Sequence, residues 1–260
     1  MEIDEIIISK AIIESFMKDF LGAMEVDVAI AGAGPAGMTA AYYLARGGVK
    51  TVVFERQLRV GGGMPGGGMM FNRIVVQEEG KRLLDEFKVR TKEYEKGYYI
   101  ADSLETTSSI CSEAIKAGAK IFNLISVEDV MIREDDRITG LVLNWSAVSL
   151  AGLHVDPLTI RAKVVIDATG HASEICHIVV NKVGGKLRTR EGGVMGEKPM
   201  WAEIGEKEIM ENTSEVYPGL IVAGMAANAV FGAPRMGPIF GGMLLSGKRA
   251  AKVATKMLRT

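Results

Sequence analysis

Two groups of residues in this 260-residue chain could carry chemistry, and they lie far apart in the sequence. The three histidines, His154, His171 and His177, lie close to one another beyond the middle of the chain, whereas a glycine-rich turn, GAGPAG, spans residues 32–37. Imidazole can bind a metal or transfer protons, and a turn of this kind can cradle nucleotide phosphates. The separation indicates that one segment binds a nucleotide and another delivers a metal or acid–base site to it.

The glycine turn stands in a pattern that predicts a strand, a helix and a second strand. Residues 26–31 form a short apolar run, residues 38–46 have helical periodicity, and residues 51–54 form a second apolar run. Glu55 follows that run, about 20 positions beyond the central glycine, which is the usual offset of an acid that binds ribose. The unit is typical of a dinucleotide-binding fold.

Each part of this unit has a physical role. Gly32 permits the tight turn, Gly34 lets a pyrophosphate approach the backbone, and Gly37 lets the helix pack on the strand. The helix N-terminus presents free N–H groups to the phosphates, and Glu55 is expected to accept hydrogen bonds from a ribose diol. The cofactor-binding residues predicted here are Gly32, Gly34, Ala36, Gly37, Glu55 and Arg56.

A second glycine cluster spans residues 61–68. Such a run can let backbone lie against a ligand, or it can form a mobile loop. Its place directly after the ribose-binding acid favours a loop that wraps the nucleotide or the group attached to it. We therefore expect Gly62 and Gly63 to bind the cofactor, together with Val127 at the start of a later predicted strand.

The remaining pattern predicts one α/β domain over residues 1–260. Helices are expected at 9–21, 79–90 and 103–117, and strands at 120–124, 127–132, 138–145 and 162–166. The expected fold is Rossmann-like, of the two-dinucleotide-binding-domain flavoprotein type, with a small inserted β lobe. Residues 24–75 and 160–260 would form the core, residues 76–159 the inserted helices and lobe, and residues 1–23 a helical segment that packs on the core or on a neighbouring subunit.

Composition favours small-molecule ligands. The net charge is −1 and the basic residues are scattered, so neither a nucleic acid nor a membrane surface is an expected partner. No apolar run reaches the roughly 18 residues that a membrane span needs. The two cysteines, Cys111 and Cys176, do not have zinc-site spacing, and the acidic start of the chain is unlike a signal peptide, so we expect a cytoplasmic protein.

Several motifs together resemble one family over roughly residues 24–258. They are the turn at 32–37, Glu55-Arg56, the glycine cluster at 61–68, His154-Val155-Asp156-Pro157, Asp167-Ala168-Thr169-Gly170-His171 and the segment RMGPIFGGM at 235–243. This combination resembles the thiamine thiazole synthase family, and specifically its archaeal sulfide-dependent members. The segment at 235–243 is the most specific of these marks.

The resemblance implies a transferase of thiamine biosynthesis that consumes NAD as a substrate. Such an enzyme releases nicotinamide from NAD, isomerises the ADP-ribose, condenses it with glycine and installs sulfur to form an adenylated thiazole carboxylate. In yeast and plant relatives a cysteine of the enzyme, two residues before an Asp-Pro pair, gives up its sulfur. His154 stands at that position here. The resemblance therefore implies that sulfide comes from solution and that the enzyme turns over repeatedly.

The resemblance also implies an iron site. Asp156 and His171 match the family's Fe(II) ligands, which come from adjacent subunits of an octamer, and His154 joins them as a catalytic residue. From spacing alone, a loop aspartate and a hydrogen-bonded histidine at a strand end would be the simpler interpretation. Carboxylate oxygen and imidazole nitrogen nevertheless suit Fe(II), and a site with few protein ligands leaves positions open for substrate and sulfide.

Arg235 is our candidate for binding the carboxylate of glycine, because its guanidinium matches a carboxylate in two-pronged fashion. Met236 and Gly237 are expected beside it at the substrate, and Met225 is expected to border the cofactor. Cys176 lies outside the sulfur-donor motif and is interpreted as a small core residue, with a rescue role as sulfur donor left open. His177 is interpreted as structural or exposed.

Three other functions are compatible with parts of the sequence. An FAD- or NAD-dependent oxidoreductase shares the glycine turn and the acid, although such enzymes usually carry a larger substrate domain. A sugar-phosphate isomerase would share the isomerisation step. A nucleotide-responsive binding protein without catalysis would leave the set His154, Asp156, His171 and Arg235 without a purpose.

Overall fold

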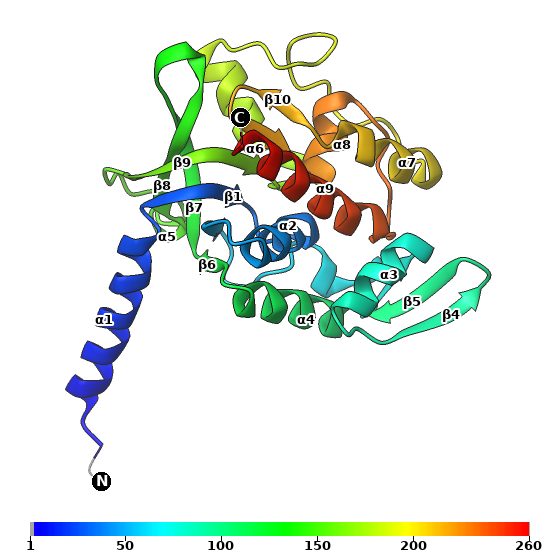
Figure 1. Ribbon diagram of the computed structural model, residues 1–260, viewed down its shortest axis with the longest axis horizontal. Helices are drawn as coiled ribbons and strands as arrows, with labels where there is room; N and C mark the ends of the chain where they lie inside the picture. Colours follow the sequence, from blue (N-terminus) through cyan, green and yellow to red (C-terminus); the bar gives the residue numbers. More distant parts are fainter. Residues whose placement is uncertain (1–2, 260) are drawn as a thin grey trace.

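A mostly parallel sheet forms the centre of the molecule in this computed structural model, which describes residues 3–259 (Figure 1). The strand order is β10 (Glu215–Tyr217), β11 (Leu220–Val222), β9 (Leu158–Asp167), β1 (Glu25–Ala31), β2 (Thr51–Glu55) and β6 (Lys120–Asn123). The pairs β11–β9, β9–β1, β1–β2 and β2–β6 are parallel. Every residue of β2 is buried, as expected for a parallel sheet that is covered on both faces. The predicted Rossmann-like fold class is confirmed.

Helices cover both faces of this sheet. On one face, α2 (Pro35–Arg46) lies between α4 (Ser103–Lys116) and α9 (Gly241–Met257), and their apolar side chains share one core with β1 and β2 (Figure 1). On the other face, α6 (Glu174–Ile178) and α8 (Met225–Phe231) contribute to a second core. α7 (Ala202–Asn212) packs against α8 and α9. Short helical turns occupy Met64–Gly66, Gly68–Met70, Glu134–Asp136, Gly170–Ala172 and Val179–Val183.

The separate small sheet lies mostly within the predicted insert at 76–159, but the strands predicted at 120–145 do not form it. β7 (Ile125–Ile132) and β8 (Ile138–Trp145) form a hairpin that joins the main sheet through β9, and β6 joins it through β2. The three-stranded sheet is instead β3 (Arg73–Val76), β5 (Tyr98–Asp102) and β4 (Thr91–Glu95), with α3 (Glu78–Glu86) between β3 and β4 in the chain. β4 is exposed along most of its length, so its sequence lacks the alternation that would predict a strand.

The predicted helix at 79–90 is too long. α3 ends at Glu86, and Lys88 adopts a left-handed φ of 59°, which a continuing helix does not allow. The other predicted helices and strands correspond to observed elements with ends that differ by a few residues, as is usual for helix and strand limits.

The first helix, α1 (Glu5–Gly22), projects from the body at the end opposite the small sheet (Figure 1). Asp4 caps it by accepting from the amides of Ile6 and Ile7. Phe20 is its one buried residue within the described helix, and the rings of Phe16 and Phe20 contact Phe122, both with edge geometry. The rest of its apolar surface is exposed, namely Ile6, Ile7, Ile8, Ile12, Ile13, Met17 and Leu21. Only the end of α1 therefore packs on its own core.

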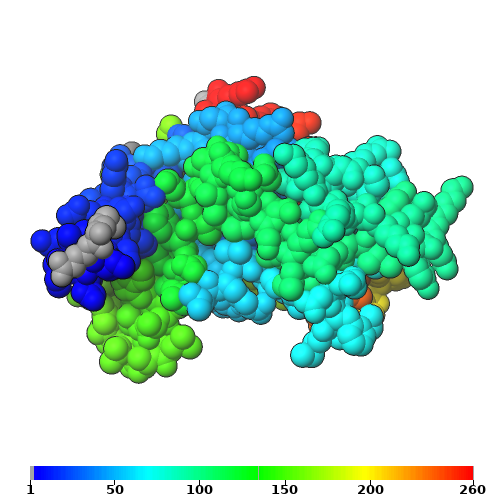
Figure 2. Space-filling model, turned by 90° about the horizontal axis from the view of Figure 1, so that it is seen from below, coloured from blue at the N-terminus to red at the C-terminus, as the bar shows by residue number. Residues whose placement is uncertain are grey.

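α5 (Ser146–Leu150) and the loop that follows it also stand out from the body, at the same end as α1 (Figure 2). This loop is exposed throughout residues 151–157. Among the described residues 3–259, no helix is long and apolar enough to cross a membrane.

A buried carboxylate fixes the chain where β9 ends. Oδ1 of Asp167 accepts from the amide and the hydroxyl of Thr169 at 3.0 and 2.7 Å, and Oδ2 accepts from the amides of Ile175 and Cys176, both at 3.1 Å. Asp167 is fully buried. The strand end and the start of α6 are thereby tied together, and the turn that carries His171 is held between them.

Asp167→Ala removes the acceptor for these four hydrogen bonds and leaves buried donors without partners. We expect the free energy of unfolding, measured by urea denaturation, to fall by about 3 kcal/mol. Asp85→Ala is the matched control, because Asp85 is an exposed carboxylate that pairs with Lys81 on α3, and its loss should cost less than about 1 kcal/mol. Equal losses in the two variants would show that Asp167 does not anchor this turn.

Candidate active site

A cavity of about 350 Å³ opens at the carboxyl ends of β1, β2 and β9. Side chains and backbone from three segments far apart in the sequence line it. Predicted cofactor-binding residues are well represented among them, namely Gly32, Gly34, Glu55, Arg56, Gly62, Gly63 and Val127. The carboxyl edge of parallel strands is where α/β folds of this type bind ligands.

The two outer glycines of the turn are required by close packing. A Cβ on Gly37 would lie 2.0 Å from the carbonyl oxygen of Gly32, and a Cβ on Gly32 would lie 2.5 Å from that of Ala168. Gly32 also has a φ of 98°. Gly34 differs, because a Cβ there would meet no atom within 4 Å and its backbone is ordinary. The space in front of Gly34 is therefore open to a ligand.

Glu55 is buried at the floor of this cavity. One carboxylate oxygen accepts from the amide of Ala33 and the other from the amide of Gln57, both at 2.8 Å. The carboxylate therefore stabilises the glycine turn as well as facing the cavity. Each oxygen of a carboxylate can accept a further hydrogen bond, so a ribose diol can still bind.

Arg56 forms an ion pair with Glu174 across the cavity. Burial raises the pKa of the Glu174 carboxyl, and the charge of Arg56 opposes that rise. The ion pair links the end of β2 to the start of α6, so both sides of the cavity mouth are joined by it.

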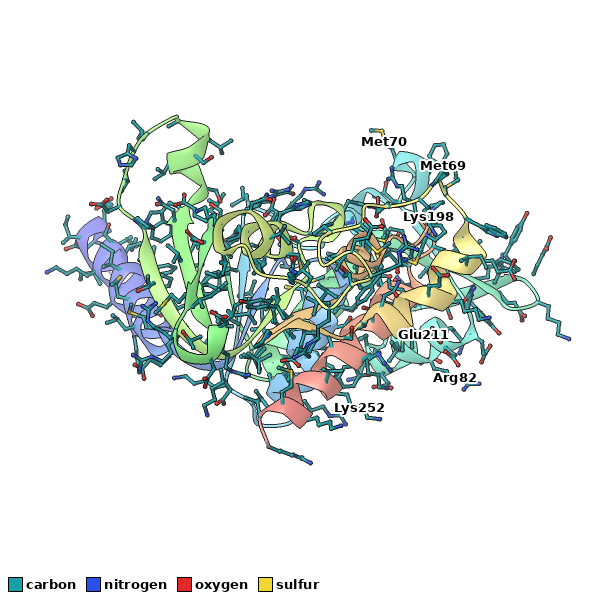
Figure 3. All side chains as sticks on the ribbon, turned by 90° about the horizontal axis from the view of Figure 1, so that it is seen from above. Met69, Met70, Arg82, Lys198, Glu211 and Lys252 are labelled. Carbon is teal, nitrogen blue, oxygen red and sulfur yellow. The ribbon has the colours of Figure 1, made fainter. Side chains whose placement is uncertain are left out.

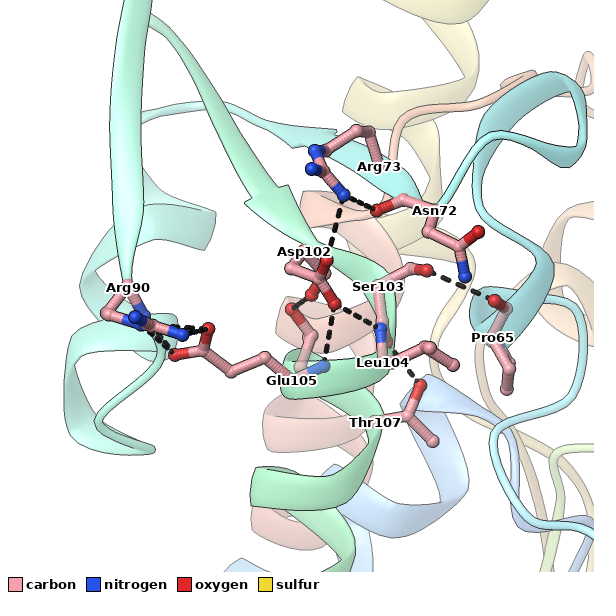
Figure 4. A network of polar contacts seen from close by, with 10 residues as sticks. Pro65, Asn72, Arg73, Arg90, Asp102, Ser103, Leu104, Glu105 and Thr107 are labelled. Carbon is pink, nitrogen blue, oxygen red and sulfur yellow. Dashed lines mark hydrogen bonds and ion pairs between the residues drawn. The ribbon is translucent and has the colours of Figure 1, made fainter.

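The second glycine cluster is tied to the first residue of α4, next to a polar network at the end of β5 (Figure 4). Ser103 Oγ donates to the carbonyl of Pro65 at 3.1 Å, and Asp102 accepts from Arg73 at 2.8 Å. Asp102 also caps α4 by accepting from the amides of Leu104 and Glu105. The bond from Ser103 and the bond from the Gly61 amide to the carbonyl of Ala33 at 2.7 Å hold the cluster beside the glycine turn.

A second cavity of about 250 Å³ adjoins the first. Both are lined by Gly63, Ala168, Gly170 and His171. The second cavity also contains Ala36 and Met225, and the predicted substrate-binding residues Arg235, Met236 and Gly237. Gly37 lines neither cavity, which agrees with its packing against Gly32. The chain thus places the nucleotide-type cavity next to an arginine and a histidine.

Glu197 connects that histidine and that arginine, and no pattern in the sequence indicated it. Its Oε1 lies 2.6 Å from His171 Nδ1, and its Oε2 lies 3.8 Å from Arg235 Nε. The Glu197 side chain is 15% exposed, against 53% for His171 and 60% for Arg235. A carboxylate on Nδ1 orients the ring and leaves Nε2 for another ligand. Glu197 lies in an irregular glycine-containing segment, where no periodicity could have indicated its direction.

His154 and Asp156 are not brought to this site within one chain. Both lie on the exposed loop after α5, which projects from the body at upper left in Figure 3, and neither lines a cavity that His171 lines. Among residues 3–259, no group of three or more His, Cys, Asp or Glu side chains is placed to hold a metal. Within one chain, Asp156 and His171 therefore share no cavity.

The two cysteines are poor candidates for chemistry. Cys176 is fully buried, and burial together with the nearby Asp167 raises the pKa of its thiol well above the ordinary value. Burial also raises the pKa of Cys111, which is half-buried on α4. The thiolate, which is the reactive form, is therefore disfavoured at both positions. His177 is exposed on α6.

The fold and the two cavities define an α/β protein of the dinucleotide-binding class. A geranylgeranyl bacteriochlorophyll reductase-like protein from Thermoplasma acidophilum shares this fold, with a TM-score of 0.54 and 17% identity over 90% of this chain and 79% of that chain.

The chain belongs to the Thi4 family, whose model matches residues 9–240. It is 62% identical to a thiamine thiazole synthase from Methanothermobacter thermautotrophicus over the full length of both chains, and 57% identical to one from Pyrococcus furiosus over 95% of each. The crystal structure of Thermovibrio ammonificans THI4 is similar over 100% of both chains, with a TM-score of 0.96 and 49% identity. The family predicted from the sequence motifs is confirmed.

The contrast between Gly34 and Gly37 gives a test of the nucleotide cavity. Gly37→Ala forces a Cβ into the carbonyl of Gly32, so we expect a loss of about 3 kcal/mol in the free energy of unfolding. Gly34→Ala meets no protein atom and should stay within about 1 kcal/mol of the unsubstituted protein. Its methyl group should nevertheless block the phosphates and weaken NAD binding, measured by calorimetry, by about tenfold or more. Unchanged NAD binding by Gly34→Ala would contradict this placement of the pyrophosphate.

Proposed function

We propose that the protein is a sulfide-dependent thiamine thiazole synthase, which converts NAD, glycine and sulfide to an adenylated thiazole carboxylate with release of nicotinamide. The observation that carries this proposal is the pair of adjoining cavities, one built by the glycine turn and Glu55 and the other by His171 and Arg235. Membership of the Thi4 family supports the same reaction class.

The first cavity is suited to the ADP half of NAD. The N-terminus of α2 follows Gly34 directly, so its free amides and positive dipole end can face the pyrophosphate. Glu55 offers carboxylate oxygens to the adenosine ribose, and Gly62 and Gly63 bring a second stretch of backbone to the same cavity. The nicotinamide riboside would then extend toward the shared residues Gly170 and His171 and into the second cavity.

The second cavity is suited to glycine. The ion pair between Arg235 and Glu197 is made through Nε of the guanidinium. This pair leaves the two terminal nitrogens of Arg235 for a ligand. Those nitrogens can grip the carboxylate of glycine in two-pronged fashion. Met225 and Met236 are buried beside Arg235 and keep water away from the ligand.

The residues present also fit an Fe(II) ion. Glu197 binds Nδ1 of His171 and so leaves Nε2 directed to a metal, an arrangement common in metal-binding histidines. Asp156 of an adjacent subunit would supply a carboxylate, with His154 beside it. When bound, the iron would offer open positions that hold sulfide next to the substrate.

Sulfide from solution is the proposed sulfur source. His154 occupies the place of the sulfur-donating cysteine and has no sulfur to give. Cys176 is buried with a raised thiol pKa, so it is an unsuitable substitute.

A homo-octamer is the proposed assembly. The apolar side of α1 and the loop with Asp156 are both exposed at one end of the chain. Large exposed apolar patches of this kind mark protein–protein contacts. Assembly would cover α1 and bring Asp156 to His171 of a neighbour.

The metal site can be tested apart from the nucleotide site. Asp156→Ala and His171→Ala should each lose Fe(II) binding and thiazole formation, yet still release nicotinamide from NAD, because both variants keep the glycine turn and Glu55 and because nicotinamide release comes before the step that needs iron. Glu197→Ala should weaken Fe(II) binding by about tenfold, since it removes the partner of His171 Nδ1 but neither of the proposed ligands. Metal content by mass spectrometry and products by chromatography give the readouts. Full thiazole formation by both ligand variants under chelation would rule out this site.

The sulfur source predicts the stoichiometry of the reaction. With NAD, glycine, Fe(II) and excess sulfide without oxygen, each chain should make more than one adenylated thiazole, and its own mass should stay unchanged. Cys176→Ala should turn over equally. A strict limit of one product per chain, or a protein mass lowered by loss of a cysteine sulfur, would defeat the proposal.

A further inference from the structure

The buried carboxylate of Glu206 lies behind the second cavity and takes no part in the proposed reaction. It belongs to α7 and is 7% exposed. Its Oε2 accepts from the amide of Gly242 in the first turn of α9 at 2.8 Å. Its Oε1 is buried and has no hydrogen-bond partner among the described residues. Such a group is costly to bury, so a structural need is indicated.

Gly242 is shaped to accept this carboxylate. A Cβ at Gly242 would lie 2.9 Å from Oε2 and 3.0 Å from both Cδ and Oε1 of Glu206. Any other residue at 242 would displace the carboxylate or the helix. The carboxylate lies at the N-terminal end of α9, where the helix dipole offsets part of the cost of burying a negative charge.

Gly205, the residue before Glu206, packs on the chain at 234–236, which leads into α9. A Cβ on Gly205 would lie 2.7 Å from the carbonyl oxygen of Pro234 and 2.7 Å from Cγ of Met236. Asn228 donates to the carbonyl of Gly205 at 3.1 Å, and the amide of Trp201 donates to the carbonyl of Arg235 at 2.9 Å. The start of α7 is thus packed directly on the backbone at Arg235.

Residues 205 and 206 therefore clamp the segment 234–242 at both ends. Between the two contacts lie Arg235, Met236, Gly237 and Phe240, all of which line the second cavity. The amide of Phe240 donates to the carbonyl of Val75 at 3.0 Å, which adds a support from the small sheet. A shift at the start of α9 would be passed to the cavity wall through this short segment.

We propose that Glu206 is a positioning residue for the second cavity: its carboxylate fixes the first turn of α9 and, through it, the placement of Arg235 against the substrate carboxylate. The part that concerns glycine rests on the proposed function. The clamp itself rests only on the contacts above.

Glu206→Ala should loosen the clamp. Hydrogen exchange at the Gly242 amide and over residues 235–243 should become faster, and the KM for glycine should rise about tenfold, because a small displacement of a binding group weakens a two-pronged contact. The KM for NAD should change less than about twofold, since no residue of the segment 234–242 lines the first cavity. Glu206→Gln keeps an acceptor for the Gly242 amide, so its hydrogen exchange over residues 235–243 and its KM for glycine should stay close to those of the unsubstituted protein.

Gly242→Ala provides a second, independent variant in case Glu206→Ala does not fold. Its methyl group should push the carboxylate away and give the same faster exchange and the same rise in KM. Glu211→Ala is the matched control, because Glu211 is exposed on the same helix, as labelled in Figure 3, and it should change neither property.

Protonation gives a readout that does not depend on activity. Burial raises the pKa of Glu206 from its ordinary 4.5 to about 7, the Gly242 amide opposes the rise, and no charged side chain is among the causes. The folded protein therefore holds this proton more tightly than the unfolded chain. The stability of the unsubstituted protein relative to Glu206→Gln should fall as pH rises from about 4.5 to about 7 and then level off. The difference in melting temperature between the two proteins should therefore widen over that range.

The outcomes separate the clamp from the function. Unchanged exchange over residues 235–243 in both Glu206→Ala and Gly242→Ala would overturn the proposal, whatever the kinetics. Suppose that Glu206→Ala and Gly242→Ala show faster exchange but an unchanged KM for glycine, while Arg235→Ala raises that KM. This result would overturn the proposed link between Glu206 and Arg235. If Arg235→Ala also leaves the glycine KM unchanged, the glycine assignment fails while faster exchange still supports the clamp.

Discussion

The site depends first on the carboxylate of Asp167. This buried group ends β9 and accepts from two donors of Thr169 and from the amides of Ile175 and Cys176. The turn between these partners carries Gly170 and His171, which line both cavities. An unpaired buried carboxylate would be very costly, so the turn has little freedom to adopt another conformation. The position of His171 at the border between the two cavities is a consequence of this one group.

Close backbone contacts complete the arrangement around that turn. Gly32 and Gly37 allow the glycine turn to lie against Ala168 and against itself, and Glu55 ties the turn to the end of β2. Glu197 then joins His171 to Arg235 from a third segment. One chain thus builds a cavity of the dinucleotide-binding type beside a cavity lined by Arg235 and His171, while it leaves Asp156 on an exposed loop. The proposed iron site would therefore need Asp156 from a neighbouring subunit.

Local patterns in the sequence were sufficient for the glycine turn, Glu55 and the core strands, because their spacing is set by one strand–turn–helix unit. The family followed from a set of motifs, several of which form the cavity walls. The sequence could not indicate Glu197 or Glu206, since both act across irregular segments or between helices distant in the chain. It also misplaced the small sheet, because exposed β4 has no apolar alternation while β7 and β8 look like an independent hairpin. The sequence also left open whether α1 packs on its own core, and in the structure only its end does so.

The identity of the nucleotide that the protein carries is the most direct test of the NAD-consuming function. Protein purified from cells can be denatured and its released ligand measured by mass spectrometry. We expect an adenosine diphosphate derived from NAD, with the mass of an ADP-ribose derivative or of the adenylated thiazole. Release of a flavin nucleotide would contradict this function and would favour an oxidoreductase instead.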